Sequence, residues 1–363
     1  MARLPPRLIV SAGAWHTRGV RDLTTLPKTH LHLHFTGSMR LSTLAELAEE
    51  QGRRMPGALL DGVALRVPAN ERGWFRFQRL YDAARAVVRS EEIMRRIVRE
   101  AAEDDAAEGS RRLEIQVDPT SYAPFVGGIT PALEIVLDEA KSASTATGVE
   151  VGVVVACSRT RHPLDAATLA RLAVNYAGDQ PGEVIGFGLS NDERSGVTSS
   201  WAKAFGIARR GGLASLPHGG ELLGPEHVRD VLTHLGPTRL GHGVRLAEDP
   251  ELLDQVVAAG IALELAPASN VALGVYETAA DVPLRTLAEA GAMIALSADD
   301  PLLFRSRLVD QYEIARGDHG MSDAQLADLA RGSVRASLAD ETRKREWLTD
   351  IDAWLATPPD SGR

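Results

Sequence analysis

Three histidines, His30, His32 and His34, alternate with apolar residues in the segment Thr29–Phe35. On a β-strand, alternate side chains share one face, so we expect the three imidazoles on one side and the apolar side chains on the other. Two imidazoles separated by one residue can bind one metal ion from the same side. His30 is better suited to a structural role, and a chain with ten histidines can also contain this pattern by chance.

Two further histidines stand beside glycines at predicted strand ends. In His218-Gly219-Gly220-Glu221, a histidine and a carboxylate lie three residues apart, which suits a metal ligand next to a proton-transfer group. The glycines, Gly220 among them, let the backbone approach a ligand closely. Gly241-His242-Gly243 places another histidine in the same way. Each motif by itself is also typical of a glycine turn with exposed polar residues.

Two adjacent carboxylates, Asp299 and Asp300, close the last predicted strand in Ser297-Ala298-Asp299-Asp300-Pro301. Such a pair repels unless a cation or hydrogen-bond donors compensate. A helix cap in front of Pro301 explains one of the two aspartates but not readily both. Three histidines and one aspartate form a ligand set that suits zinc. The four motifs together therefore indicate a metal centre more strongly than any one of them.

Short apolar segments alternate with longer segments of helical periodicity, which indicates a parallel sheet with helices between its strands. Eight strands are predicted, at Thr29–Phe35, Arg112–Val117, Val149–Ala156, Val184–Leu189, Gly212–Leu216, Thr238–Gly241, Ala262–Leu265 and Met293–Leu296. Helical periodicity is clearest at Leu41–Gln51, Glu91–Ala107, Ile129–Thr147, His227–Leu235 and Leu284–Ala290. This order predicts an α/β fold, a (β/α)8 TIM barrel, whose strands all end at one mouth, where the four motifs would meet.

The predicted barrel domain covers residues 26–350, between an irregular extension at 1–25 and a frayed tail at 351–363. An excursion with extra helices is expected after the first strand, although residues 53–82 show little regular pattern. A formal charge of −9 over 363 residues argues against nucleic acid or an anionic membrane as the main partner. The single cysteine, Cys157, excludes an intrachain disulfide and a zinc site built on a Cys-x-x-Cys pair. Without a secretory signal or a membrane-spanning run, we expect a cytoplasmic protein.

The order and spacing of these motifs resemble the adenosine deaminase family of the amidohydrolase superfamily, from Pro27 to about Tyr312. The resemblance rests on Pro27-Lys28-x-x-Leu31-His32-x-His34, His218-x-Gly220-Glu221, Arg239-x-Gly241-His242-Gly243, Glu264-x-x-Pro267-x-Ser269-Asn270 and Asp299-Asp300-Pro301. It implies one zinc ion per chain, held by His32, His34, His218 and Asp299. Glu221 would donate a proton to purine N1, His242 would orient the attacking water and help deprotonate it, and Asp300 would hydrogen-bond purine N7. The implied reaction converts a 6-aminopurine nucleoside to its 6-oxo form and releases ammonia.

The chain departs from the family's usual pattern on the ribose side of the implied pocket. Phe35-Thr36-Gly37 stands where the family has Leu-Asp-Gly, so Thr36 replaces an aspartate that contacts the ribose 5′-hydroxyl. Asn191-Asp192-Glu193 stands where the family has Gly-Asp-Glu, so Asn191 alters the wall near purine N3. These changes favour a nucleoside modified at its 5′ position. We predict 6-amino-6-deoxyfutalosine, an intermediate of an alternative menaquinone route, as the substrate.

The segment from Trp74 to Arg79 offers aromatic and basic side chains to such an extended substrate. Phe75 or Phe77 could stack on its carboxyphenyl ring, and Arg76 or Arg79 could meet its carboxylate. The alternative is an amphipathic helix with outward-facing arginines.

Other functions stay open on the same residues. Adenosine or 2′-deoxyadenosine is the alternative substrate for the same chemistry, and adenine alone is a third. A metal-binding protein that has lost catalysis is disfavoured, because it would need neither Glu221 nor His242. A small-molecule purine nucleoside is the expected partner, and a homodimer is compatible with the sequence.

Overall fold

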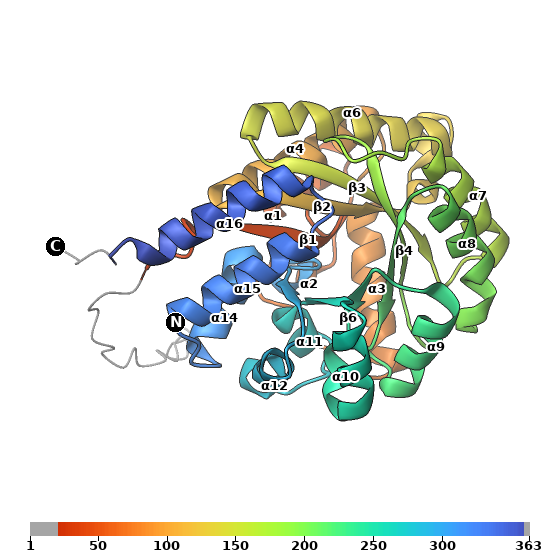
Figure 1. Ribbon diagram of the computed structural model, residues 1–363. Coiled ribbons are helices and arrows are strands. Elements are labelled where there is room, and N and C mark those ends of the chain that lie inside the picture. Colours follow the sequence, from red (N-terminus) through yellow and green to blue (C-terminus); the bar gives the residue numbers. More distant parts are fainter. Residues whose placement is uncertain (1–20, 359–363) are drawn as a thin grey trace, which may run out of the picture.

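The computed structural model describes residues 21–358, in which eight parallel strands run in order from β1 to β8 around a barrel (Figure 1). The strands are β1 (Lys28–His34), β2 (Ser110–Val117), β3 (Glu150–Ser158), β4 (Val184–Ser190), β5 (Ala214–Gly219), β6 (Arg239–His242), β7 (Ala262–Leu265) and β8 (Ile294–Leu296). A parallel bridge between Leu33 and Asp299 joins the two ends of the sheet. The predicted (β/α)8 TIM barrel is confirmed.

All eight predicted strands are present, and the largest difference lies at the end of β5. The sequence predicts a strand over Gly212–Leu216, which ends where the apolar run meets Pro217. The strand instead continues to Gly219, and His218 pairs with Gly241 of β6. His218 therefore lies within the sheet and not in a loop.

Helices fill the connections between the strands and cover the outside of the barrel (Figure 1). They are α1 (Leu41–Glu50), α2 (Gly57–Leu60), α3 (Glu71–Arg85), α4 (Glu91–Ala107), α5 (Ala123–Val126), α6 (Ile129–Thr147), α7 (Pro163–Val174), α8 (Ala202–Arg210), α9 (Pro225–Leu235), α10 (Pro250–Ala258), α11 (Pro267–Ala272), α12 (Leu284–Glu289), α13 (Pro301–Phe304), α14 (Leu308–Gly317), α15 (Asp323–Ala336) and α16 (Glu341–Ala356). Short 3-10 turns occur at Pro119–Ser121, Thr198–Trp201, Val244–Glu248 and Ala279–Asp281.

The excursion after β1 is more regular than its sequence suggests. Residues 53–82 show little pattern, yet helix α3 begins at Glu71 and runs for 15 residues. Asn70 caps it, because its side chain accepts a hydrogen bond from the backbone N–H of Gly73. The helical periodicity of this segment is hard to recognise in the sequence, because aromatic residues occur on both faces of α3. Phe77 is buried, whereas Phe75 is exposed.

The predicted frayed tail at 351–363 is wrong for its first residues. Helix α16 continues to Ala356, lies beside α15 and buries Ile351 and Trp354 (Figure 1). The Trp354 indole N–H donates to the hydroxyl of Thr25 at 3.0 Å. The prolines and glycine near the end of the chain suggested fraying, but this apolar face docks the helix. Residues 1–20 and 359–363 lie outside the described residues, so most of the predicted extension does too.

A network of buried ion pairs lies among the strands, apart from the large apolar core of the protein. Arg239 pairs with Glu114 at 2.5 Å and with Glu264 at 2.6 Å, and all three are buried. Arg112 pairs with Glu114 at 2.8 Å. Buried charges are tolerated only when they are paired and hydrogen-bonded in this way. The network ties β2, β6 and β7 together beneath the mouth.

None of the helices between residues 21 and 358 is both long enough and apolar enough to cross a bilayer.

We expect Trp354→Ala to lower the free energy of unfolding by about 3 kcal/mol, a typical cost for truncating a buried tryptophan. The change removes the ring from the apolar core cluster and removes its hydrogen bond to Thr25. Urea unfolding followed by circular dichroism measures the effect. Leu164→Ala is the control, because Leu164 is 62% exposed and its loss should cost less than about 0.5 kcal/mol. Equal effects of the two changes would contradict a docked α16.

Candidate active site

The histidine strand does not alternate as its sequence predicts. The register of β1 against β2 shifts between His30 and Leu33. His30 bonds Asp105 of α4 at 3.0 Å, while Leu31 packs with Ala262 and Ala295 of β7 and β8. The expected shared face for three imidazoles is therefore wrong. The irregularity separates His30, which has a structural role, from His32 and His34.

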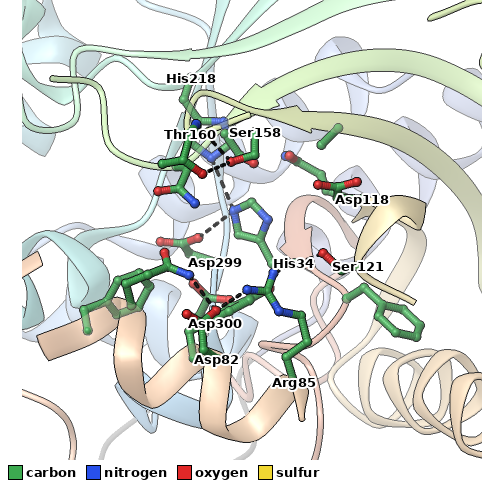
Figure 2. Close-up of a pocket in the computed structure, with 18 of the residues that line it drawn as sticks. His34, Asp82, Arg85, Asp118, Ser121, Ser158, Thr160, His218, Asp299 and Asp300 are labelled. Atoms are coloured by element: carbon green, nitrogen blue, oxygen red, sulfur yellow. Dashed lines mark hydrogen bonds and ion pairs between the residues drawn. The ribbon is translucent and has the colours of Figure 1, made fainter. Parts of the chain in front are cut away.

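Four side chains from three separate parts of the barrel converge at its mouth. The Nε2 atom of His34 lies 3.3 Å from Nε2 of His32 and 3.2 Å from Nε2 of His218. The Oδ1 atom of Asp299 lies 3.3 Å from His34 Nε2 and 3.5 Å from His32 Nε2. Figure 2 shows His34 between His218 and Asp299.

This spacing fits a single metal ion. Zinc binds imidazole nitrogen and carboxylate oxygen at 2.0–2.2 Å in tetrahedral geometry, which places neighbouring donor atoms about 3.3–3.5 Å apart. The four measured separations fall in this range or just below it. The His32, His34 and His218 group, and groups that include Asp299, therefore form a buried cluster that fits a metal site.

The protonation of His34, His218 and Asp299 suits a metal ion, whereas that of His32 does not. Burial lowers the pKa of His32, but its contacts with Asp299 and Glu264 outweigh burial and raise that pKa to about 10, so a bound cation would have to displace its proton. Burial lowers the pKa of His34, and it lowers the pKa of His218 well below its ordinary value, so these imidazoles offer lone pairs at neutral pH. Burial alone would raise the pKa of Asp299, but interactions with His32 and His34 outweigh it and hold that pKa well below its usual range. Asp299 is therefore a carboxylate.

Neighbouring side chains hold the cluster in position. The Nδ1 atom of His32 lies 2.8 Å from Oε2 of Glu264, which Arg239 holds from the other side. The hydroxyl of Ser269 donates to Oδ2 of Asp299 at 2.6 Å. Such partners orient metal-binding imidazoles and carboxylates. Glycine at 241 leaves room for the ligands, because a Cβ atom there would lie 3.0 Å from Cε1 of His32.

Glu221 and His242 lie beside the cluster, with Oε1 of Glu221 at 3.7 Å from Nε2 of His242. Burial, reinforced by the charges of Asp299 and Glu193, raises the pKa of Glu221 well above its ordinary value. Burial lowers the pKa of His242 to about 3. At neutral pH the site thus presents a protonated acid beside a neutral imidazole.

Asp300 faces the same cavity as its neighbour but differs from it in protonation. Burial and the charge of Asp299 raise the pKa of Asp300 well above its usual range. Its Oδ1 atom has no hydrogen-bond partner among the described residues. A Cβ atom on residue 37 would lie 1.7 Å from that oxygen, so Gly37 is required by this close approach. A buried polar atom without a partner is a natural contact for a ligand.

The residues of this site line a cavity of about 430 Å³. Figure 2 shows part of its lining. Its walls come from α3 and from the carboxyl ends of β1 to β6 and β8, and they include Trp74, Phe77, Asp82, Arg85, Gln116, Asp118, Tyr122, Arg161 and Asn191. Pockets of this size accept small organic ligands, and mixed aromatic and polar walls fix their orientation.

Some of the residues predicted to contact substrate line the cavity, and others do not. Phe77 and Asn191 line the cavity. Phe75, which is 64% exposed, and Arg76 lie on the outer face of α3, so the expectation that they contact substrate is wrong. The outward-facing amphipathic helix is the correct interpretation for these two residues.

Thr36 and Gly220 support the walls of the cavity from behind. The Thr36 hydroxyl lies 2.6 Å from the hydroxyl of Tyr122, and it is Tyr122 that lines the cavity. Gly220 adopts a φ of 77°, and a Cβ atom there would lie 2.9 Å from Val228. This glycine lets the chain turn just before Glu221.

Sequence reasoning missed several side chains at the site. Arg85 lines the cavity from the last turn of α3 and donates to Ser121 at 3.2 Å. Tyr122 and Asp118 follow the second strand, where only their position after a strand end could have indicated them. Glu193 is buried behind Glu221 and accepts hydrogen bonds from its loop.

Comparisons with known proteins agree with this architecture. The family model described as "Adenosine deaminase" matches residues 27–354. A Streptomyces virginiae protein named "Putative adenosine/adenine deaminase" is 60% identical over 336 residues, which cover 92% of this chain and 98% of that protein. A Rhizobium leguminosarum protein named "Adenine deaminase" is 32% identical over 326 residues, with coverage of 90% and 99%.

Among solved structures, that of adenine deaminase from Arthrobacter aurescens matches with a TM-score of 0.83 and 26% sequence identity, covering 92% of this chain and 99% of that one. The fold and the side-chain cluster define a (β/α)8 barrel whose mouth carries a residue group that fits a metal site. Within that class, the chain belongs to the adenosine deaminase family.

We expect Glu264→Gln to weaken binding of a divalent ion by about 10- to 100-fold, the usual effect of changing a residue that orients a ligand. The change removes the charge that fixes His32. Competition with a chromophoric chelator measures the affinity. Glu139→Gln is the control, because it alters another buried carboxylate, on α6. Unchanged affinity in Glu264→Gln would contradict the orienting role.

Proposed function

We propose that the chain is a zinc-dependent hydrolytic deaminase that converts the 6-amino group of a purine to a 6-oxo group and releases ammonia. The convergence of His32, His34, His218 and Asp299 beside a protonated glutamate carries the proposal. Relatives named as adenosine or adenine deaminases support it. A metal-binding protein without catalysis is disfavoured, since such a protein has no use for a buried acid next to the cluster.

The cluster would hold zinc through its three imidazoles and one carboxylate. When bound, zinc supplies a water nucleophile that is deprotonated near neutral pH. His242 is buried and neutral, and its Nε2 atom lies 3.7 Å from Oε1 of Glu221, so it would orient a water molecule beside the cluster through a hydrogen bond. Because burial lowers its pKa to about 3, we assign it this orienting role and not that of a proton acceptor at neutral pH. Its left-handed backbone, with a φ of 69°, is a strained conformation of the kind that occurs at active sites.

Glu221 would protonate purine N1. The neutral ring is a poor electrophile at C6, and proton donation at N1 makes that carbon open to attack. Burial raises the pKa of Glu221, so its carboxyl group keeps the required proton at neutral pH. Asp300 would bind the other ring of the purine, because purine N7 is a hydrogen-bond acceptor and a protonated carboxyl can donate to it.

For the substrate we propose a nucleoside extended at its 5′ position, with 6-amino-6-deoxyfutalosine as the specific candidate. The cavity continues outward from the cluster past Trp74, Phe77 and Arg85. The aromatic side chains can pack on a carboxyphenyl ring, and the Arg85 guanidinium can meet its carboxylate. Arg85 thus takes the place that the sequence analysis gave to Arg76 or Arg79.

Adenine and adenosine are the second candidates, favoured by the names of the relatives. Either would use the same four-residue cluster and the same proton donor. Adenine alone would leave the outer walls, with Asp82, Arg85 and Asp118, without a role in binding.

We expect Glu221→Gln to reduce kcat by about 10²- to 10⁴-fold, the usual contribution of a general acid. The amide keeps the shape of the side chain but cannot give up the required proton. Absorbance of the purine during turnover measures the rate, and metal analysis checks that zinc is retained. Substantial activity in a zinc-loaded variant would exclude Glu221 as the proton donor.

The substrate is tested by steady-state rates on 6-amino-6-deoxyfutalosine, adenosine, 2′-deoxyadenosine and adenine. We expect the highest kcat/KM for the first. Arg85→Met should lower that value by about 10- to 100-fold, because it removes a charged hydrogen bond, and should leave adenosine nearly unaffected. Arg76→Met on the outer face of α3 is the matched control. An adenosine kcat/KM equal to or above that of the futalosine compound would overturn the extended substrate.

A further inference from the structure

The loop that carries Glu221 is held by a carboxylate from a neighbouring loop. Oε1 of Glu193 accepts a hydrogen bond from the backbone N–H of Glu221 at 3.0 Å. Its Oε2 accepts from the N–H groups of Leu222 and Leu223, both at 2.7 Å. Three successive amides that point at one carboxylate form an anion-binding nest. The bonds link the loop after β4 to the loop after β5.

The turn around residue 193 is built to direct this side chain inward. Asn191 adopts a left-handed backbone with a φ of 78°, and its side chain accepts from the N–H of Asp192. Asp192 pairs with Arg194 at 2.7 Å. Between these two partly exposed residues, Glu193 is 2% exposed. Glu193 is thus the buried residue of this turn, and its carboxylate meets the backbone amides of the loop that carries Glu221.

Between residues 21 and 358, the ion-pair contact of Glu193 is His227, at 3.7 Å, so the three backbone amides provide the short hydrogen bonds that stabilise its carboxylate. The titratable groups around it are Glu221, His227, Arg159 and Arg245. Nδ1 of His227 is 3.7 Å away, and burial lowers the pKa of this histidine, which keeps it neutral. A buried carboxylate is costly unless hydrogen bonds compensate it. A neutral side chain could not accept all three bonds, which explains a glutamate here.

We propose that Glu193 is a positioning residue whose carboxylate fixes the backbone of Glu221 so that the Glu221 side chain faces the metal cluster. The inference rests on the proposed role of Glu221 as proton donor. Gly220 allows the turn just before this backbone, and Glu193 locks the turn that results. Its negative charge also favours the protonated form of Glu221, which is the form that can donate.

Two variants separate position from charge. Glu193→Gln keeps the length but loses the charge and the ability to accept all three bonds. Glu193→Asp keeps the charge but is too short to span the three amides. We expect kcat to fall about 10- to 100-fold in both, as for a displaced catalytic group, with KM nearly unchanged.

The pH dependence of kcat gives a readout that a merely structural role would not move. Because Glu221 must be protonated, kcat falls as pH rises through its pKa. Removing the neighbouring charge lowers that pKa, so the alkaline limb should move to lower pH in Glu193→Gln and move less in Glu193→Asp. Glu100→Gln, which removes another buried carboxylate from α4, should leave kcat and the limb unchanged.

Hydrogen–deuterium exchange of the peptide over residues 219–224 tests the contact independently of activity. We expect faster exchange in Glu193→Gln than in the wild type or in Glu100→Gln, at equal zinc content. Unchanged exchange, or a kcat loss without a shift of the alkaline limb, would overturn the positioning role. Absence of purine deamination by the wild type would instead refute the proposed function, and the exchange result would still decide whether Glu193 holds the loop.

Discussion

Closure of the barrel between β1 and β8 is the constraint on which the site depends. The two strands meet through one short bridge, in which His34 N–H donates to the carbonyl of Asp299 and Asp299 N–H donates to the carbonyl of His32. The residues that close the sheet are therefore the residues whose side chains meet in the cluster. We call this junction of β1 and β8 the seam. If it loosened, the side-chain nitrogen atoms of His32 and His34 would move away from the carboxylate of Asp299. Asp299 adopts a left-handed φ of 63° at this bridge, a strained conformation that the surrounding hydrogen bonds maintain.

The seam is supported from both sides by groups that do not reach the cavity. Nε2 of His30 accepts from the N–H of Ala298 at 3.0 Å, while its Nδ1 bonds Asp105. This histidine thus ties the end of β8 to α4. On the other side, Glu264 links His32 to Arg239 and so to the buried ion pair of Arg239 with Glu114. Stability and function are joined here, because the same buried contacts close the barrel and orient the cluster.

Most of the architecture could be predicted from the sequence, and the exceptions have physical reasons. Apolar segments at regular intervals revealed all eight strands, because parallel strands are buried on both faces. Polar residues after those strands indicated where the cluster lies. The shift in β1 was not predictable, since period-two alternation assumes a regular strand. The docked end of α16 was missed because local proline and glycine signals say nothing about packing against distant residues such as Thr25.

The ribose side of the cavity was the least predictable part for a related reason. Which residues of α3 face inward depends on how the helix packs against the barrel, and its buried residues are Gly73, Phe77, Leu80 and Ala84. Phe77 and Arg85 then face the cavity while Phe75 faces solvent.

Three carboxyl groups share the mouth in two different protonation states, which the sequence alone could not reveal. Asp299 is ionised because His32 and His34 contact it, whereas Glu221 and Asp300 are protonated because burial is not compensated by a cation. The negative charge of Asp299 itself helps to keep the other two neutral. One ionised carboxylate and two protonated ones suit the proposed binding of a cation and a neutral purine together. Burial and the contacts of Asp299 with His32 and His34 together therefore give each acid the protonation state that the proposed reaction needs.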